Sequence, residues 1–426
     1  MRVAVAGLWH LGCVTAAGLA SVGHDVIGYD ADAERVAALR QGRAPLLEPG
    51  LDPLLGQGIA AGRLAFTSDA REAARGAQVL WVTADTPLDD EDRADLGPVL
   101  SLVADLAVSL RPGALALISS QAPVGFVRRL EQAWSERGLR FACVPENLRL
   151  GQALVDFLRP ERVLAGVRSD ADRADLERLL APLSWPIEWT SVESAEMAKH
   201  ALNGFLATSA AFANELARLC EVTGADARQV ERALRSDPRV GPRAYVAPGA
   251  AFAGGTLARD LRFLAGIARD RGVAAPLVEG VLASNQAHAA WLLETVRRRL
   301  HGVERPVCAV LGLVYKPGTD TLRRSASVEL CARLVADGAA LQVHDPALAQ
   351  PPAELPSEAR LCGTALGALA GADLAVIATP WPEFRGLTAE AFVQTMRRPC
   401  VVDPGWLLAD ALGRDPRIDY AAAGRP

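Results

Sequence analysis

The sequence has few cysteines, and their spacing does not form a structural site. Seven cysteines occur in 426 residues, and none belongs to a Cys-x-x-Cys pair. An odd number of scattered cysteines is typical of reduced thiols in a cytosolic protein, and it argues against a disulfide framework or a zinc site. We therefore expect a cytoplasmic protein that binds no metal.

Long apolar runs and a large excess of one charge are also lacking. No segment is long and apolar enough to cross a bilayer. The formal net charge of −5 gives no sign of a basic surface for nucleic acid. Half of the residues are apolar, and the length suits about two to three domains with sizeable cores. These properties favour a multi-domain globular protein that engages neither nucleic acid nor membrane.

The first thirty positions carry the most informative pattern. A short apolar strand is predicted over residues 3–6, and a turn from Gly7 to Gly12 leads into an Ala-rich helix over 13–22. A second strand over 25–28 is followed by Asp30. Strand, glycine turn, helix, strand and terminal acid form the dinucleotide-binding fingerprint, in which the helix N-terminus faces the pyrophosphate and the acid binds the adenosine ribose. Asp30 favours NAD over NADP.

Trp9 departs from this fingerprint, because it stands where a middle glycine lets the pyrophosphate approach the backbone. Two interpretations stay open. In one, the unit binds a nucleotide despite Trp9. In the other, it is a Rossmann-shaped unit whose ligand site Trp9 has closed.

Further buried strands are predicted over 79–83, 114–119 and 141–144, and ligands of doubly wound sheets bind outside the carboxyl ends of such strands. Thr86, Ser120, Gln121 and Glu146 are therefore candidates by position. Residues 46–55, rich in Pro and Gly, are predicted to form a connection. A second α/β unit is predicted from strand 306–312, with later strands ending at Asp345 and covering 374–379 and, as the last strand, 400–403.

A long helix is predicted over 194–222, with others over 226–235 and 277–300. Glu196, Lys199 and Asn203 share one face of the long helix, whereas His200 lies on another face and is expected to be structural. Between the later helices, a loop of small residues over 249–261 contains Thr256, a plausible N-cap one turn before Asp260. The predicted fold is α/β, with two Rossmann-like doubly wound domains (1–192 and 303–426) joined by a central long-helix region (193–302).

The succession of segments resembles the UDP-glucose/GDP-mannose dehydrogenase family over nearly the whole chain. The segments that carry the resemblance are GLWHLG, LLEPGL, TADTPLDDEDRADL, PVGF, PENLRLGQALVDFLRPERVLAG, SAEMAKHALNGFLA, NELARLCE, LGLVYKPGTDTLRRS and VHDP. Enzymes of this family oxidise the C6 hydroxyl of a nucleotide sugar to a carboxylate with two NAD. The resemblance implies an N-terminal NAD domain, a C-terminal domain for the nucleotide diphosphate and a homodimer formed through the central helix.

The resemblance also implies roles for individual residues, which follow as three groups. Cofactor contacts are expected from Gly7, Trp9, His10, Leu11, Gly12, Asp30, Arg35, Thr86, Gln121 and Arg323. Contacts with a UDP- or GDP-linked sugar are expected from Glu146, Leu148, Lys199, Asn203, Phe252, Gly254 and Lys316. The catalytic positions are Lys199, Asn203, Asp260, Thr256 and Glu146, where Lys199 and Asn203 stabilise a developing negative oxygen and Asp260 positions or deprotonates a water.

The departures from the family pattern concentrate at the chemistry. Aligned on Asp260, the nucleophilic cysteine of the family is Thr256 here, and a threonine hydroxyl is not ionised near neutral pH as a thiol of pKa about 8.5 readily is. Other departures are Gln121 for a threonine, Leu150 for a second acid, Ala251 and Ala253 for loop glycines, Leu257-Ala258-Arg259 for Phe-Pro-Lys, Gly405 for an arginine and Asp85 for a glycine.

Two functions from different classes remain. The first is an NAD-dependent dehydrogenase of nucleotide sugars, useful in polysaccharide biosynthesis, whose chemistry is altered because Thr256 replaces the nucleophile. The second is a catalytically silent relative that binds nucleotide sugars as a scaffold in polysaccharide or glycoconjugate assembly. Formation of NADH from a nucleotide sugar separates the two.

Overall fold

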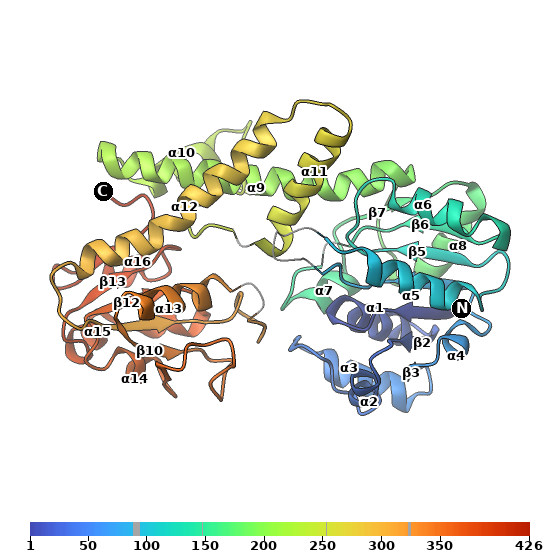
Figure 1. The fold of residues 1–426 in the computed structure, drawn as a ribbon, viewed down its shortest axis with the longest axis horizontal. Coiled ribbons are helices and arrows are strands. Elements are labelled where there is room, and N and C mark those ends of the chain that lie inside the picture. The colour runs from blue at the N-terminus through green and yellow to red at the C-terminus, as the bar shows by residue number, and fades with distance from the viewer. Residues whose placement is uncertain (88–93, 147, 253, 323–324) are drawn as a thin grey trace. The chain divides into compact units, whose positions relative to one another are not determined.

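The computed structural model describes residues 1–87, 94–146, 148–252, 254–322 and 325–426. These residues divide into two compact units, an N-terminal unit (Met1–Leu202) and a C-terminal unit (Asn203–Pro426), shown in Figure 1. The division falls within the long helix α9 (Val192–Thr223). Among the described residues, no helix combines the length and apolar character needed to cross a membrane.

The N-terminal unit is built on an eight-stranded sheet with the order β3-β2-β1-β4-β5-β6-β7-β8, in which only the β6–β7 pair is antiparallel among the described strands. The strands are β1 (Arg2–Ala6), β2 (Asp25–Tyr29), β3 (Leu64–Thr67), β4 (Val79–Val82), β5 (Leu115–Ile118), β6 (Arg140–Cys143), β7 (Val163–Gly166) and β8 (Ile187–Thr190). The helices are α1 (His10–Ser21), α2 (Ala33–Leu39), α3 (Leu51–Ala60), α4 (Ala70–Ala74), α5 (Gly97–Ala107), α6 (Phe126–Ala133), α7 (Ala153–Leu158) and α8 (Asp170–Leu180).

Helices cover both faces of this sheet, so its strands are buried on both sides. Val3 and Val5 of β1 belong to the core with α1, α3, α7 and α8, whereas Ala4 and Ala6 belong to the core with α4, α5 and α6. This alternation follows from the period of two along a strand. It explains why the strands appear in the sequence as continuous apolar runs.

The C-terminal unit contains a six-stranded, all-parallel sheet with the order β11-β10-β9-β12-β13-β14. Its strands are β9 (Val307–Leu311), β10 (Ala340–His344), β11 (Ala359–Leu361), β12 (Leu374–Ile377), β13 (Cys400–Val402) and β14 (Asp419–Ala421). Its helices after α9 are α10 (Ala227–Ser236), α11 (Arg259–Asp270), α12 (Pro276–Leu300), α13 (Ala326–Ala336), α14 (Ala365–Leu369), α15 (Ala389–Thr395) and α16 (Ala409–Leu412).

The fold class predicted from the sequence is confirmed, with two parallel-sheet Rossmann-like units and a long helix between them. Two local predictions are wrong. The stretch 46–55 is more than a connection, because α3 begins at Leu51, where Gly50 adopts a left-handed φ of 81° that lets the chain enter the helix. The strand at 400–403 is not the last, because β14 pairs with β13 at the sheet edge.

In each sheet, a glycine directly follows the strand that comes first in the chain, β1 or β9. At that point the segment after the adjacent strand, β4 or β12, passes close to the glycine. Gly7 follows β1 with φ +92°, and a Cβ there would lie 2.6 Å from Cα of Ala84. Gly312 follows β9 with φ +95°, and a Cβ there would lie 2.5 Å from the backbone nitrogen of Thr379. Both positions therefore require glycine for conformation and for space.

All seven cysteines are free and buried. Desolvation raises the pKa of every one of them, to about 12 for Cys308, Cys331 and Cys400. Since the thiolate is the reactive form, these thiols are packing groups in the folded protein.

We expect Gly7→Ala to destabilise the protein more than Gly23→Ala, although both glycines have φ +92°. Both changes add the left-handed cost of about 1–2 kcal/mol. Only Gly7→Ala also forces atoms apart, since nothing lies within 4 Å of a Cβ at Gly23, and such overpacking adds about 1–3 kcal/mol. Urea unfolding of the two variants measures the difference, and equal losses would contradict the close approach.

The native thiols should resist alkylation. At pH 8 we expect iodoacetamide to label no cysteine of the folded protein on the timescale on which it labels free cysteine, because every thiol is buried with a raised pKa. In urea all seven should react. Mass spectrometry counts the labels, and rapid labelling of one native cysteine would show an accessible thiolate.

Candidate active site

Asp30 fastens the glycine turn of the N-terminal unit. Its Oδ2 accepts a hydrogen bond from the Leu8 N–H at 2.8 Å and another from the Arg35 guanidinium at 2.8 Å. Its Oδ1 accepts from the Asp32 N–H at 3.0 Å. A carboxylate offers about four lone-pair sites, so Asp30 can still accept a ribose hydroxyl while it holds the turn.

Trp9 lies beside this ion pair, with the Arg35 guanidinium 5.3 Å from the centre of the indole ring. Trp9 is also the N-cap residue of α1, and no side chain makes a capping hydrogen bond there and no acid lies in the first turn. A helix N-terminus without a capping side chain is the type of site at which proteins bind a pyrophosphate. Together with the cradle that a Cβ at Gly7 would fill, this arrangement fits a dinucleotide.

The structure thus brings Gly7, Trp9, Gly12, Asp30 and Arg35 together, as the sequence predicts. A Cβ at Gly12 would lie 2.1 Å from the Gly7 carbonyl oxygen, so α1 packs directly on the turn. Leu11 is half-buried on the first turn of α1. The contact of each residue with NAD stays a prediction.

Sequence reasoning missed Glu48, which joins His10 to a distant segment. The Glu48 carboxylate is 5% exposed, lies 2.7 Å from His10 Nε2, and accepts from the N–H groups of Gly151 (2.8 Å) and Ala153 (2.9 Å). The only signal was that Glu48 is one of two acids, with Asp52, in an otherwise apolar, Pro- and Gly-rich stretch. Its partners lie about a hundred positions further along the chain, where no local pattern points to them.

Residues at the carboxyl ends of β4 and β5 also meet. Thr86 is fully buried, and its hydroxyl donates to the carbonyl oxygen of Gln121 at 2.9 Å. Glu146 follows β6 and is half-buried, and Leu148 packs against the core of the N-terminal unit. Arg323, predicted to lie near the cofactor, falls outside the described residues.

Asn203 and Asp260 form a buried pair in the C-terminal unit. The Asn203 side-chain amide donates a hydrogen bond to Asp260 Oδ2, and the two residues are 6% and 0% exposed. Lys199 precedes Asn203 by one turn of α9, so both project from the same side of the helix. The pair joins α9 to α11, and it brings together two of the residues predicted to be catalytic.

Thr256 is exposed and lies within a π-helical turn (Gly254–Ala258) that leads into α11. The prediction that Thr256 is an N-cap is wrong, because the N-cap residue of α11 is Ala258, without a capping side chain. The π-helical turn continues directly into α11, so Thr256 lies inside helical backbone and not at the residue before the helix. Such turns are frequent at functional sites.

Three polar residues that the sequence reasoning missed hold the loop before Thr256. Asn285 of α12 donates to the Phe252 carbonyl (2.9 Å) and accepts from its N–H (3.0 Å). Asn214 of α9 accepts from the Gly249 N–H (2.9 Å), and His288 Nε2 lies 2.8 Å from the Gly249 oxygen. Burial lowers the pKa of His288. Lys316, another predicted site residue, is half-buried in the segment that follows β9.

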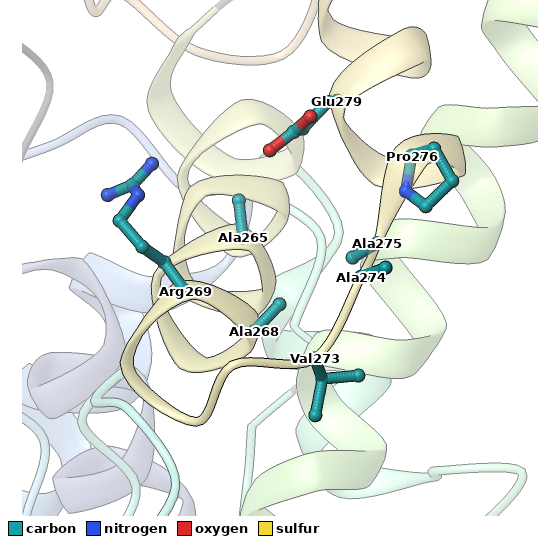
Figure 2. Close-up of a pocket in the computed structure, with 8 residues that line it drawn as sticks. All are labelled: Ala265, Ala268, Arg269, Val273, Ala274, Ala275, Pro276 and Glu279. Atoms are coloured by element: carbon teal, nitrogen blue, oxygen red, sulfur yellow. The ribbon is translucent and has the colours of Figure 1, made fainter.

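A separate hollow of about 290 Å³ lies between α11 and the start of α12, as Figure 2 shows. It is lined by Ala265, Ala268, Arg269, Val273, Ala274, Ala275, Pro276 and Glu279. None of these is a predicted site residue, and we assign the hollow no part in the chemistry.

Comparisons with known proteins agree with this architecture. Models of the UDP-glucose/GDP-mannose dehydrogenase family match in order: the NAD binding domain over residues 1–184, the central domain over 193–287 and the UDP binding domain over 309–409. UDP-glucose 6-dehydrogenase of Pseudomonas aeruginosa is 34% identical, over 100% of this chain and 98% of the relative.

Among solved structures, a UDP-glucose dehydrogenase from Pyrobaculum islandicum is similar with a TM-score of 0.89 and 29% identity, covering 99% of this chain and 97% of that one. A UDP-D-ManNAc dehydrogenase from Pyrococcus horikoshii gives a TM-score of 0.87 and 25% identity, covering 100% and 99%. The matched domains and the relatives aligned from end to end show that the chain belongs to the UDP-glucose/GDP-mannose dehydrogenase family.

Proposed function

We propose that the protein is an NAD-dependent oxidoreductase acting on the C6 hydroxyl of a UDP- or GDP-linked sugar or a close analogue, with chemistry altered at Thr256. The observation that carries the proposal is the buried hydrogen bond between Asn203 and Asp260, one turn of α9 beyond Lys199. Residues 1–184, which match the NAD binding domain of the family, would hold the cofactor, and NAD would accept a hydride from the substrate carbon.

Lys199, Asn203 and Asp260 have different roles in the proposed first oxidation. The sugar alcohol loses a hydride and a proton, giving an aldehyde, NADH and H⁺. The Lys199 ammonium stabilises the negative charge that develops on the oxygen. The Asn203 amide has two N–H donors, of which one binds Asp260, so the other can bind the same oxygen. Asp260 orients the amide and holds a carboxylate ready to receive a proton.

The second oxidation must proceed without a thiolate. Thr256 has no acidic thiol, and all seven cysteines are buried. The aldehyde must therefore add water, and its hydrate must lose a second hydride to give the acid, a second NADH and further protons. Water is a weaker nucleophile than a thiolate, and the step depends on Asp260 to orient and deprotonate it. We propose that the wild-type reaction stops largely at the aldehyde.

Incubation with NAD and a panel of UDP- and GDP-sugars tests this function. We expect one sugar to yield about one NADH per molecule consumed, because hydration replaces the fast thiol route. Thr256→Cys should move the ratio toward two, whereas Thr256→Ser, which changes size without adding a thiol, should not. The ratio is obtained from NADH absorbance and sugar analysis. A wild-type protein that binds sugar nucleotides and forms no NADH with any of them would support the silent scaffold.

We also propose that the protein is a homodimer formed through α9. Phe205, Phe212 and Leu219 recur at intervals of seven along this helix and are 68%, 52% and 55% exposed. A stripe of large apolar side chains at this spacing on one helix suits packing against the same helix of a second copy. The family resemblance points to the same surface.

Phe212→Glu should convert the dimer to a monomer, because it places a charge in the apolar stripe. Val273→Glu is the matched control, since Val273 is 62% exposed but lies outside α9. Light scattering after gel filtration measures the mass. A monomeric wild-type protein, or dissociation by both variants alike, would overturn the assignment.

A further inference from the structure

Two side chains of α9, those of Glu196 and His200, form hydrogen bonds with the backbone of the segment that follows β5. Glu196 is 6% exposed and accepts the Gly125 N–H at 2.7 Å and the Val127 N–H at 2.9 Å. His200, one turn further along, is fully buried, and its Nε2 lies 3.0 Å from the Ala122 carbonyl oxygen. The two contacts span the turn between β5 and α6 from its carbonyl end to its amide end.

The Glu196 contact replaces a cap that α6 lacks. Its N-cap residue is Gly125, with φ 92° and no side chain of its own to bind the first N–H groups of the helix. The Glu196 carboxylate binds these groups from α9, at the positive end of the helix dipole. Burial raises the pKa of Glu196, and the two N–H donors lower it.

The strand order places the same segment on the side of the sheet where the nicotinamide half of a dinucleotide is expected. Asp30 ends β2 and marks the adenosine side of the sheet, so β4 and β5, across the switch point between β1 and β4, belong to the other mononucleotide half. Thr86 at the end of β4 donates to the Gln121 carbonyl at 2.9 Å. The segment is thereby tied to β4 on one side and to α9 on the other.

Lys199 lies between Glu196 and His200 in the sequence of α9. A helix turn held at Glu196 and at His200 fixes the rotation and the axial position of the residue between them. We propose that Glu196 and His200 are positioning residues, which set Lys199 in register with the nicotinamide-side segment that carries Gln121. The catalytic part of this inference rests on the proposed dehydrogenase function.

The test compares Glu196→Gln with Glu193→Gln. The glutamine at 196 keeps one acceptor but turns an NH₂ group toward a backbone N–H, so one contact is lost and the segment shifts. Loss of a hydrogen bond to a charged group corresponds to about a tenfold change. We expect the Kd for NAD to rise and kcat to fall by about that factor, with the KM for the sugar unchanged. Glu193 is the matched control, because it lies on the same helix but binds the side chains of Arg128 and Arg168 and no backbone N–H group of the segment in the hydrogen bonds found there.

A rescue and a double-mutant cycle exclude a merely structural effect. His200→Leu removes the donor and should lower kcat, whereas His200→Gln, whose amide nitrogen reaches roughly the place of Nε2, should restore most of it. Combined with Gln121→Ala, the Glu196→Gln effect on NAD binding should be strongly non-additive, since both act through one segment.

Calorimetric NAD titration separates the possible failures. If the wild-type protein binds NAD but oxidises no sugar, the proposed function fails. The Kd values for NAD of the two variants then still test whether Glu196 positions the segment. If Glu196→Gln binds NAD as the wild-type and Glu193→Gln proteins do, or if its effect adds simply to that of Gln121→Ala, the positioning role is overturned. A loss of thermal stability that leaves Kd and kcat unchanged also overturns it.

Discussion

Both units depend on a carboxylate at the end of one strand that binds the backbone turn after the neighbouring strand. In the N-terminal unit Asp30 accepts the Leu8 N–H at 2.8 Å. In the C-terminal unit Asp345 accepts the N–H groups of Leu313 and Val314, at 2.6 and 3.0 Å. A buried N–H without a partner costs about 1–3 kcal/mol, so these acids allow a tight glycine turn to lie at the carboxyl end of a fully covered sheet. The same constraint requires glycine at both turns and brings the candidate ligand residues to one edge.

The strands, the glycine turn after β1 and the acid that binds this turn could be predicted from the sequence, because their signals are local. Apolar runs, a glycine turn and an acid after the next strand lie within a window of about thirty residues, and each reflects one physical requirement. What could not be predicted depends on distant partners. Glu48 binds N–H groups about a hundred positions away, and β14 is short and pairs only at a sheet edge. The helix α3 was hidden because Gly and Pro, read as breakers, here stand at its start.

The candidate site shows the same division between local and distant signals. Helical spacing placed Glu196, Lys199 and Asn203 on one face of α9, but it gave no means of telling their tasks apart. The contacts do so, because Glu196 binds the backbone before α6 while Asn203 binds Asp260. The resemblance found Asp260 and Phe252, yet the residues that hold this loop, such as Asn285, escaped notice because their partners are backbone atoms. Backbone contacts leave no pattern of their own in a single sequence.

The position of the thiols limits the chemistry proposed for the chain. A thiol at residue 256 would be exposed on the π-turn, where no burial would raise its pKa. Burial instead raises the pKa of Cys308 and Cys400 to about 12, so neither supplies a thiolate at neutral pH. The buried Asn203–Asp260 pair contains the two groups that the proposed hydride removal from an alcohol requires, an amide N–H donor and a carboxylate. These two observations, a threonine at position 256 and a buried Asn203–Asp260 pair, are what the proposed chemistry depends on, in which the first oxidation needs no thiolate and the second uses water.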